Sequence, residues 1–179
     1  GTPFVVAGTF TVQTAPFSFL ATTTTSVLDE TYALLRLAPA AAGSPTFTVQ
    51  GGTLTSSNLV IGDGTNPVTV TLNTNDPSTN VTGNLTIGSG STLVASNVGA
   101  LDIGGSWLNG GTFTHSSGSV LFNSTDTGET VSSGGSLFSA VNFNSSSGGW
   151  TITQSATSSG SFSITNANTF VLSPGMTLE

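Results

Sequence analysis

Few side chains in this sequence could carry out catalysis. His115 is the only histidine, so a Ser-His-Asp triad would need it as the base. The carboxylates include two close pairs, Asp29 with Glu30 and Asp126 with Glu129, and a glycosidase needs two carboxyl groups across a sugar-binding cleft. His115 lies near a turn, and both acidic pairs lie in turn-like sequence. We therefore interpret these side chains as solvent-facing and predict no catalytic residues and no enzymatic activity.

Two loop segments carry the oxygen donors that Ca²⁺ prefers. They are residues 62–66, Gly-Asp-Gly-Thr-Asn, and residues 73–76, Asn-Thr-Asn-Asp. Each segment has one carboxylate, and neither matches the Gly-Gly-x-Gly-x-Asp nonapeptide or the EF-hand loop. The sequence has no cysteine, which excludes thiolate metal sites and disulfide bonds. We interpret both segments as turns, predict no metal site, and keep Ca²⁺ as the one candidate cofactor.

Threonine recurs in Thr-x-Thr spacing. Residues i and i+2 of a strand point to the same face, so pairs that stack in register would form a lattice of hydroxyl and methyl groups, as in β-solenoid proteins that bind ice. Threonine is also common in solvent-facing strands, and the uneven spacing of the pairs favours this second interpretation. The pairs are Thr9/Thr11, Thr46/Thr48, Thr53/Thr55, Thr69/Thr71, Thr112/Thr114 and Thr151/Thr153.

Aromatic side chains offer another candidate surface, because exposed rings stack on sugars. The chain has 11 Phe, 2 Trp and 1 Tyr. Most alternate with polar residues, and we predict that they lie in the core. Trp107, which follows two glycines, is the predicted exception.

Charge excludes several classes of partner. The 179 residues include one basic side chain, Arg36, against eight acidic ones, and the formal net charge is −7. One cation cannot neutralise a row of phosphates, so we predict no nucleic-acid binding. The same charge disfavours anionic membrane surfaces. No apolar segment approaches the roughly 20 residues of a spanning helix, so we predict no membrane insertion.

Short segments with apolar residues at every second position predict β-strands. Glycine or proline interrupts most of the chain and β-branched residues dominate, so the sequence predicts an all-β fold. Residues 27–37 could form a helix, but we interpret Tyr32, Leu35 and Leu37 as part of a strand. The clearest strands are residues 10–12, 47–49, 85–87, 101–103, 150–152 and 162–164.

Internal repeats distinguish between all-β architectures. Residues 58–64 match residues 84–90, a local period of about 26 residues, and residues 32–49 match residues 138–152 at a longer period of about 105. These repeats predict a parallel β-solenoid, with less than two copies of a larger unit and about eight coils of about 22 residues. Clusters such as Gly88-Ser89-Gly90 and Asn109-Gly110-Gly111 would supply positive-φ corners. The alternative is a pilin-like β-sandwich.

The run from Val81 to Leu93 and its continuation from Leu101 to Asn123 resemble the repeats of large bacterial cell-surface proteins with filamentous-haemagglutinin-like or autotransporter-passenger-like β-helices. The resemblance implies a right-handed parallel β-helix that is secreted or displayed on the cell surface, and it carries over no functional residues. We predict one domain over residues 1–179, with regular coils in residues 45–179. Residues 1–44 are less regular and are predicted to be a cap or partial repeat.

The two ends of a solenoid expose unpaired strand edges and apolar residues. We predict that two apolar segments without charges form self-association ends, which pair with another copy or with neighbouring repeats of a longer chain. The predicted function is that of a non-catalytic structural protein of an extracellular fibre, stalk or filament. The alternative is an adhesin or a β-helix module that binds glycans or ice. The segments are Phe4, Val5 and Val6, and Phe170, Val171 and Leu172.

Overall fold

A computed structural model describes residues 12–179, and this part of the chain contains strands and no helix. The all-β prediction is confirmed, and residues 31–37 lie in a strand, as predicted. The strands are β1 (Val12–Ala21), β2 (Thr25–Val27), β3 (Thr31–Pro39), β4 (Thr46–Val49), β5 (Thr53–Ile61), β6 (Thr69–Thr71), β7 (Ser78–Val81), β8 (Leu85–Ile87), β9 (Thr92–Val94), β10 (Leu101–Ile103), β11 (Trp107–Asn109), β12 (Thr112–Thr114), β13 (Ser119–Phe122), β14 (Glu129–Ser132), β15 (Leu137–Phe138), β16 (Ala140–Ile152), β17 (Thr157–Ser158) and β18 (Phe162–Leu172).

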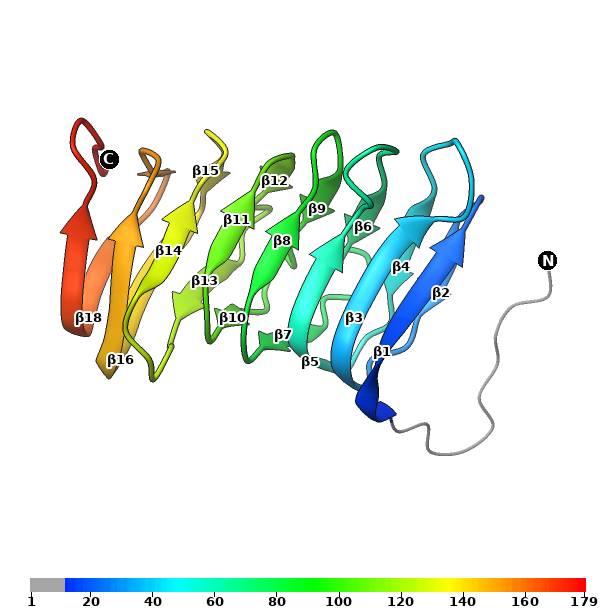
Figure 1. Cartoon of the computed structure of the whole chain (residues 1–179), viewed down its shortest axis with the longest axis horizontal. Coiled ribbons are helices and arrows are strands. Elements are labelled where there is room, and N and C mark those ends of the chain that lie inside the picture. The colour runs from blue at the N-terminus through cyan, green and yellow to red at the C-terminus, as the bar shows by residue number, and fades with distance from the viewer. Residues whose placement is uncertain (1–11) are drawn as a thin grey trace.

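The strands stack around a common axis and form a β-solenoid of about seven turns (Figure 1). The predicted architecture is confirmed, with slightly fewer turns than the eight expected. Every named pair of neighbouring strands in residues 12–179 is parallel. A β-sandwich is built from antiparallel sheets, so this alternative is excluded.

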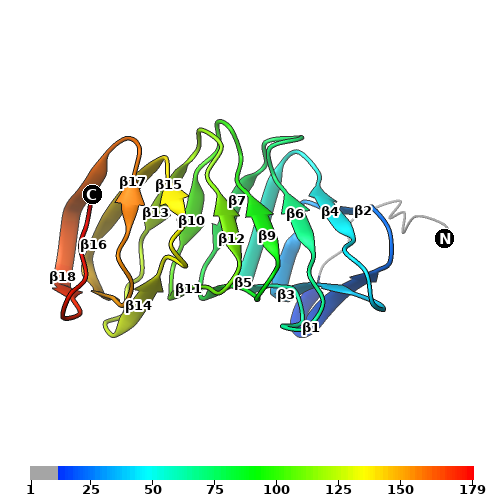
Figure 2. The ribbon, with the colours of Figure 1, turned by 90° about the horizontal axis from the view of Figure 1, so that it is seen from above.

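Each turn passes along a first, a second and a third face. β7, β10 and β13 stack on the first face, and β8, β11 and β14 stack on the second. The long strands β1, β3, β5, β16 and β18 bend around the corner between these faces and belong to both. The third face consists of β2, β4, β6, β9 and β12, followed by β15 and β17 (Figure 2).

Inward side chains form apolar columns along the axis. On the second face, Leu59, Leu85, Trp107 and Val131 occupy directly paired positions, and none is more than 1% exposed. The pairing of Leu59 with Leu85 confirms the predicted local period of about 26 residues. The columns join the layers into one continuous hydrophobic core.

The longer repeat is not a structural period. The sequence match aligned Leu35 with Val141, but Leu35 pairs with Leu59 on the second face, whereas Val141 pairs with Val120 on the first. The prediction that the chain contains less than two copies of a larger unit with this period is therefore wrong. An alternating apolar pattern fits any face of a solenoid, which explains why the match was misleading.

Aromatic side chains concentrate in the core of the C-terminal half. The Trp107 ring lies 4.9 Å from the Phe113 ring and 5.4 Å from the Phe138 ring, between centroids. Phe122 and Phe143 stack with their ring centroids 4.6 Å apart. Most aromatic residues lie in the core, as predicted, but Trp107 is not the exception. Its side chain is 0% exposed, because its strand position faces the interior.

Polar side chains tie the layers together at the corner between the first and second faces. Asn58 Oδ1 accepts a hydrogen bond from the Asn84 N–H (2.9 Å), and Asn84 Oδ1 accepts one from the Ser106 N–H (2.8 Å). Ser106 Oγ in turn accepts from the Thr130 N–H (3.0 Å). These side chains supply acceptors for backbone N–H groups where the chain turns.

Candidate functional site

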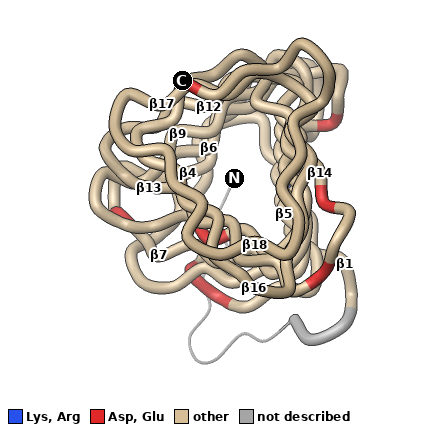
Figure 3. Tube along the Cα trace, turned by 90° about the vertical axis from the view of Figure 1, so that its left-hand side faces the viewer, with Lys and Arg blue, Asp and Glu red and all other residues tan. Residues whose placement is uncertain are grey.

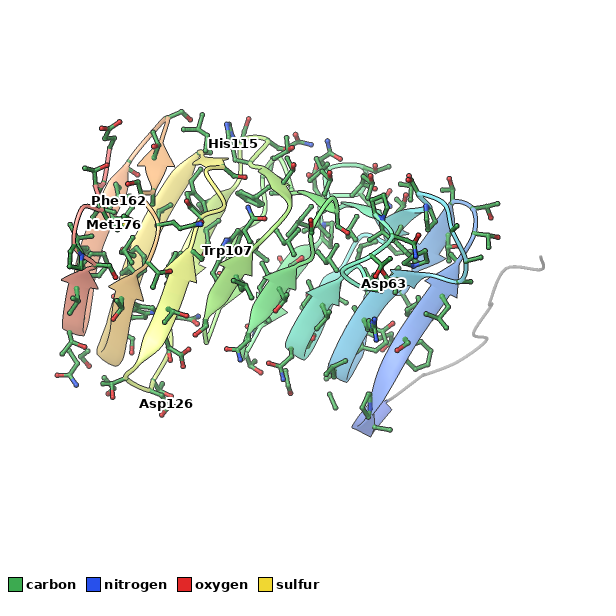
Figure 4. All side chains as sticks on the ribbon, turned by 45° about the horizontal axis from the view of Figure 1, so that its top comes forward. Asp63, Trp107, His115, Asp126, Phe162 and Met176 are labelled. Carbon is green, nitrogen blue, oxygen red and sulfur yellow. The ribbon has the colours of Figure 1, made fainter. Side chains whose placement is uncertain are left out.

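The single histidine and the second acidic pair do not form a site. His115 follows β12, and its Nδ1 lies 2.5 Å from the carbonyl oxygen of Ser116. Asp126 is exposed in the loop before β14, whereas the half-buried Glu129 accepts a hydrogen bond from Ser106 Oγ (2.5 Å). Figure 4 shows His115 and Asp126 far apart on the ribbon. Within residues 12–179, no group of three or more His, Asp or Glu side chains is placed to hold a metal ion.

The first acidic pair lies beside a buried tyrosine and contributes to its raised pKa. Asp29 and Glu30 lie between β2 and β3, next to the buried Tyr32. Burial, together with the negative charges of Glu30 and Asp29, raises the pKa of Tyr32 above its ordinary value. The phenol donates a hydrogen bond to the carbonyl oxygen of Leu28 (3.1 Å). Neither Asp29 nor Glu30 lines either of the two surface depressions described below.

The two segments with oxygen donors are turns, as interpreted from the sequence. Asp63 Oδ1 accepts hydrogen bonds from the N–H groups of Asn66 (2.7 Å) and Thr65 (2.8 Å), and Asp76 Oδ1 accepts one from the Asn97 N–H (2.6 Å). The Asn66 and Asn97 N–H groups are the main reason that the pKa of each carboxyl lies below its usual value. The carboxylates already accept N–H donors, and Ca²⁺ binding stays a prediction.

Two shallow depressions open on the surface of the described residues. The first has a volume of about 340 Å³ and lies along the first face between β13 and β16. The second, of about 300 Å³, is lined by Asn80, Thr82, Gly104, Asn123 and Thr125. No acidic, basic or aromatic side chain lines either depression, so neither provides acid–base chemistry or a platform for sugar stacking.

The C-terminal layer leaves core positions exposed. Within residues 12–179, β18 pairs with β16 on one side and with no strand on the other. Ile164 pairs with Phe143, yet Ile164 is 46% exposed and Phe143 is 1% exposed. Leu172 pairs with Ile152 in the same way and is 42% exposed, against 0% for Ile152. Among the described residues, no further strand layer covers this last layer. Figure 4 shows Phe162 at this end.

The predicted self-association residues have different positions at this end. Phe170 is half-buried, with its ring centroid 4.9 Å from that of Phe143. Leu172 occupies an exposed core position, whereas Val171 is 50% exposed and pairs with the outward Thr151. Ile164, which the sequence analysis missed, belongs to the same exposed set. The N-terminal candidates Phe4, Val5 and Val6 lie outside the described residues.

Threonine side chains form two columns on the outer side of the third face. The strands β4, β6, β9 and β12 pair in register, and their central residues are buried and apolar. Thr71 Oγ1 donates a hydrogen bond to Thr48 Oγ1 (3.2 Å), which links adjacent layers. We name these two columns the threonine array. Its members are Thr46, Thr69, Thr92 and Thr112 in one column, and Thr48, Thr71, Val94 and Thr114 in the other.

The array brings together Thr46/Thr48, Thr69/Thr71 and Thr112/Thr114, although their uneven spacing in the sequence argued against stacking in register. Thr53/Thr55 lies on the first face, Thr151/Thr153 lies at the end of β16, and Thr9/Thr11 lies outside the described residues. Thr92 was missed because valine follows it at i+2. Thr46, Thr69 and Thr92 are equally spaced in the sequence, and this signal could have identified the column.

The few charged residues are not clustered on the surface of the molecule. Figure 3 shows the acidic residues at separate places around the outline of the solenoid rather than gathered on one face. The array itself contains no charged residue. In the part of the chain that the structure describes, no helix is long and apolar enough to cross a membrane.

Comparisons with protein-family models, with curated proteins and with solved structures give no match. The geometry therefore defines the class of protein by architecture alone. It is an all-β solenoid of stacked parallel strands with an exposed C-terminal layer and a threonine array on its third face.

Proposed function

We propose that this chain is a non-catalytic structural segment of an extracellular fibre, stalk or filament, in which solenoids associate end to end through strand pairing. The observation that supports the proposal most directly is the exposed C-terminal layer. Ile164 and Leu172 hold positions that are buried one layer below, and the outer edge of β18 has no partner strand among residues 12–179. A further coil stacked on β18 would bury these apolar side chains and pair with this free strand edge.

Two interactions would stabilise a covering layer. The backbone groups along the free edge of β18 would pair with a parallel strand, which is the way β-augmentation provides affinity. Ile164, Leu172 and the half-buried Phe162 would become fully buried, and each would gain less than half of the roughly 1.5–3 kcal/mol that burying a fully exposed side chain of this kind contributes. The covering coil would come from another copy or from a neighbouring repeat of a longer chain, because both present the same strand geometry.

The extracellular location rests on the resemblance of residues 81–123 to bacterial surface repeats. The scarcity of charge also suits a stacked fibre, because like charges at paired positions of neighbouring coils would repel one another. An enzymatic role has no support from the arrangement of His115 and the carboxylates.

The experiment combines sedimentation velocity with negative-stain electron microscopy of the 179-residue chain over a concentration series. We expect rods that lengthen with concentration at constant width. The double variant Ile164→Lys with Leu172→Lys should shorten them, because an end-to-end contact would bury unpaired ammonium groups. Leu108→Lys is the matched control, since Leu108 is 54% exposed but lies on the side of the second face.

Strictly monomeric particles over the whole series would contradict the proposal. Equal shortening by Leu108→Lys would also contradict it, because association would then occur through the side of the solenoid.

A further inference from the structure

The threonine array differs from the outer sides of the other two faces. On the second face the outward column consists of Arg36, Val60, Thr86, Leu108 and Ser132. On the first face an outward column runs through Thr55, Asn80, Asp102, Leu121 and Asn142. Both columns mix charged, apolar and polar residues. A general preference for threonine in exposed strands would enrich all faces alike, so it does not explain columns that are almost purely threonine on one face.

The array repeats in two directions. Neighbouring strands of a sheet lie about 4.7–4.9 Å apart, and residues i and i+2 of one strand lie about 6.6–6.8 Å apart. The array is therefore a rectangular net in which seven of the eight corners carry a threonine hydroxyl and methyl group, and Val94 supplies methyl groups alone at the eighth. The repeat between strands lies close to the shorter repeat of water oxygens on a prism plane of hexagonal ice, and the repeat along a strand is somewhat shorter than the longer one.

The chemistry of the side chains suits ordered water. Each threonine hydroxyl offers one donor and two acceptor lone pairs, and its methyl group restricts the water molecules beside it. The Thr71 hydroxyl lies within hydrogen-bond distance of both Thr48 Oγ1 (3.2 Å) and the Phe47 carbonyl oxygen (3.3 Å), so its one proton is directed toward the layer below while its lone pairs remain for water. β-Branched side chains on a paired sheet have restricted χ1 angles, so little rotamer entropy would be lost on binding.

The array lacks the features of other ligand surfaces. It contains no charged residue, which matches an uncharged lattice of water and not an ionic partner. The aromatic residues of these strands, Phe47 and Phe113, are 0% and 4% exposed and point to the core, so no ring is available to stack on a sugar. The next strands on the third face are β15 and β17, where Leu137 pairs with Thr157. Leu137 is an exposed apolar residue, so the threonine array ends at β12.

We propose that the threonine array is an ice-binding surface, whose ligand is the prism plane of hexagonal ice. This function is independent of end-to-end association, because the array lies on the side of the solenoid and β18 lies at its end.

The test is an ice recrystallisation assay in sucrose solution, together with thermal hysteresis and crystal shape, on the 179-residue chain. We expect the chain to stop the coarsening of ice grains and to shape single crystals. Thr71→Tyr places a bulky ring in the middle of the net and should abolish both effects. Thr86→Tyr, on the second face, is the matched control and should leave both effects unchanged, because Thr86 is also a half-buried outward strand residue.

Two further variants keep the test decisive if Thr71→Tyr fails to fold. Thr114→Tyr changes an exposed member of the array and should lower the activity, whereas Val94→Thr completes the second column and should reduce the concentration needed for inhibition. Circular dichroism verifies the fold of each variant.

Coarsening at the rate of buffer alone would overturn the proposal. Equal losses in the Thr71→Tyr and Thr86→Tyr variants would overturn it too, as would retention of the chain on crystalline cellulose or chitin without any effect on ice. The Ile164→Lys and Leu172→Lys double variant should keep its activity on ice, so a failure of end-to-end association and a failure of ice binding are distinguishable.

Discussion

Buried polar side chains in this solenoid form hydrogen bonds both within their own layer and to a neighbouring layer. The buried Asn109 is an example, because its Nδ2 donates to the Ser133 carbonyl (2.8 Å) and its Oδ1 accepts from the Gly111 N–H (3.0 Å). A few buried atoms lack such a partner, and a buried polar atom without a hydrogen bond lowers stability. These atoms are Arg36 Nε, Thr79 Oγ1, Asp102 Oδ1, Trp107 Nε1 and Trp150 Nε1.

Asp102 is the acidic member of this set, and its titration should be visible in the stability of the fold. It lies in β10 between Asn80 and Leu121 of the paired strands, and burial raises the pKa of its carboxyl. Because the folded-state pKa is the higher one, stability is greatest below the ordinary pKa of about 3.9 and falls as pH rises through the folded-state value. Asp102→Asn should therefore raise the free energy of unfolding at pH 7, by less than about 1 kcal/mol since water still reaches the carboxylate.

Thermal unfolding at pH 7 and at pH 3 measures this effect, and the gain should vanish at pH 3. Asp126→Asn is the control, because it makes the same change of charge at an exposed position. An equal gain in both variants would mean that general charge repulsion, and not the burial of Asp102, is responsible.

At the scale of the elements, glycine is required where the backbone of one layer lies too close to the next layer to leave room for a Cβ atom. The prediction that Gly110 and Gly111 supply positive φ angles is wrong, whereas Gly90 has a φ of +72° as expected. A Cβ atom on Gly111 would lie 2.2 Å from the Ser91 carbonyl oxygen and 2.5 Å from that of Gly88. The same atom on Gly110 would find its nearest neighbour at 3.5 Å, an ordinary contact.

These adjacent glycines should respond differently to a methyl group. Gly111→Ala should lower the free energy of unfolding by about 1–3 kcal/mol, because backbone atoms of the layer below must move. Gly110→Ala should change it by no more than about 0.5 kcal/mol. Urea denaturation measures both values, and similar losses in the two variants would contradict the role assigned to layer spacing.

The sequence predicts the elements better than their register. Alternating apolar residues identify the strands, and the match of residues 58–64 with residues 84–90 identifies the stacking, because Leu59 and Leu85 are directly paired. The sequence does not determine which face a strand joins, since a period of two fits every face. The threonine array depends on the face and on the lengths of the connecting loops, so it becomes visible only in the structure.

Over the whole molecule, contacts join each layer mainly to its neighbours. The element pairs with the most contacts are adjacent layers, such as β16 with β18 and β1 with β3. Stability in such an arrangement is approximately a sum of terms for single layers and for nearest-neighbour interfaces. The aromatic core strengthens the C-terminal half, where Phe143 lies near Phe122, Trp150, Phe162 and Phe170.

A substitution in one half should therefore destabilise that half first. Phe143→Ala should cost about 3–5 kcal/mol locally and open β16 and β18 to hydrogen exchange, while the amides of β4 and β6 keep their protection. Phe47→Ala is the matched control and should produce the reverse pattern, because Phe47 is fully buried in β4 on the third face. Hydrogen exchange followed by mass spectrometry resolves the two regions. If both variants lost protection evenly along the chain, the solenoid would unfold as one cooperative unit and the nearest-neighbour account of its stability would be wrong.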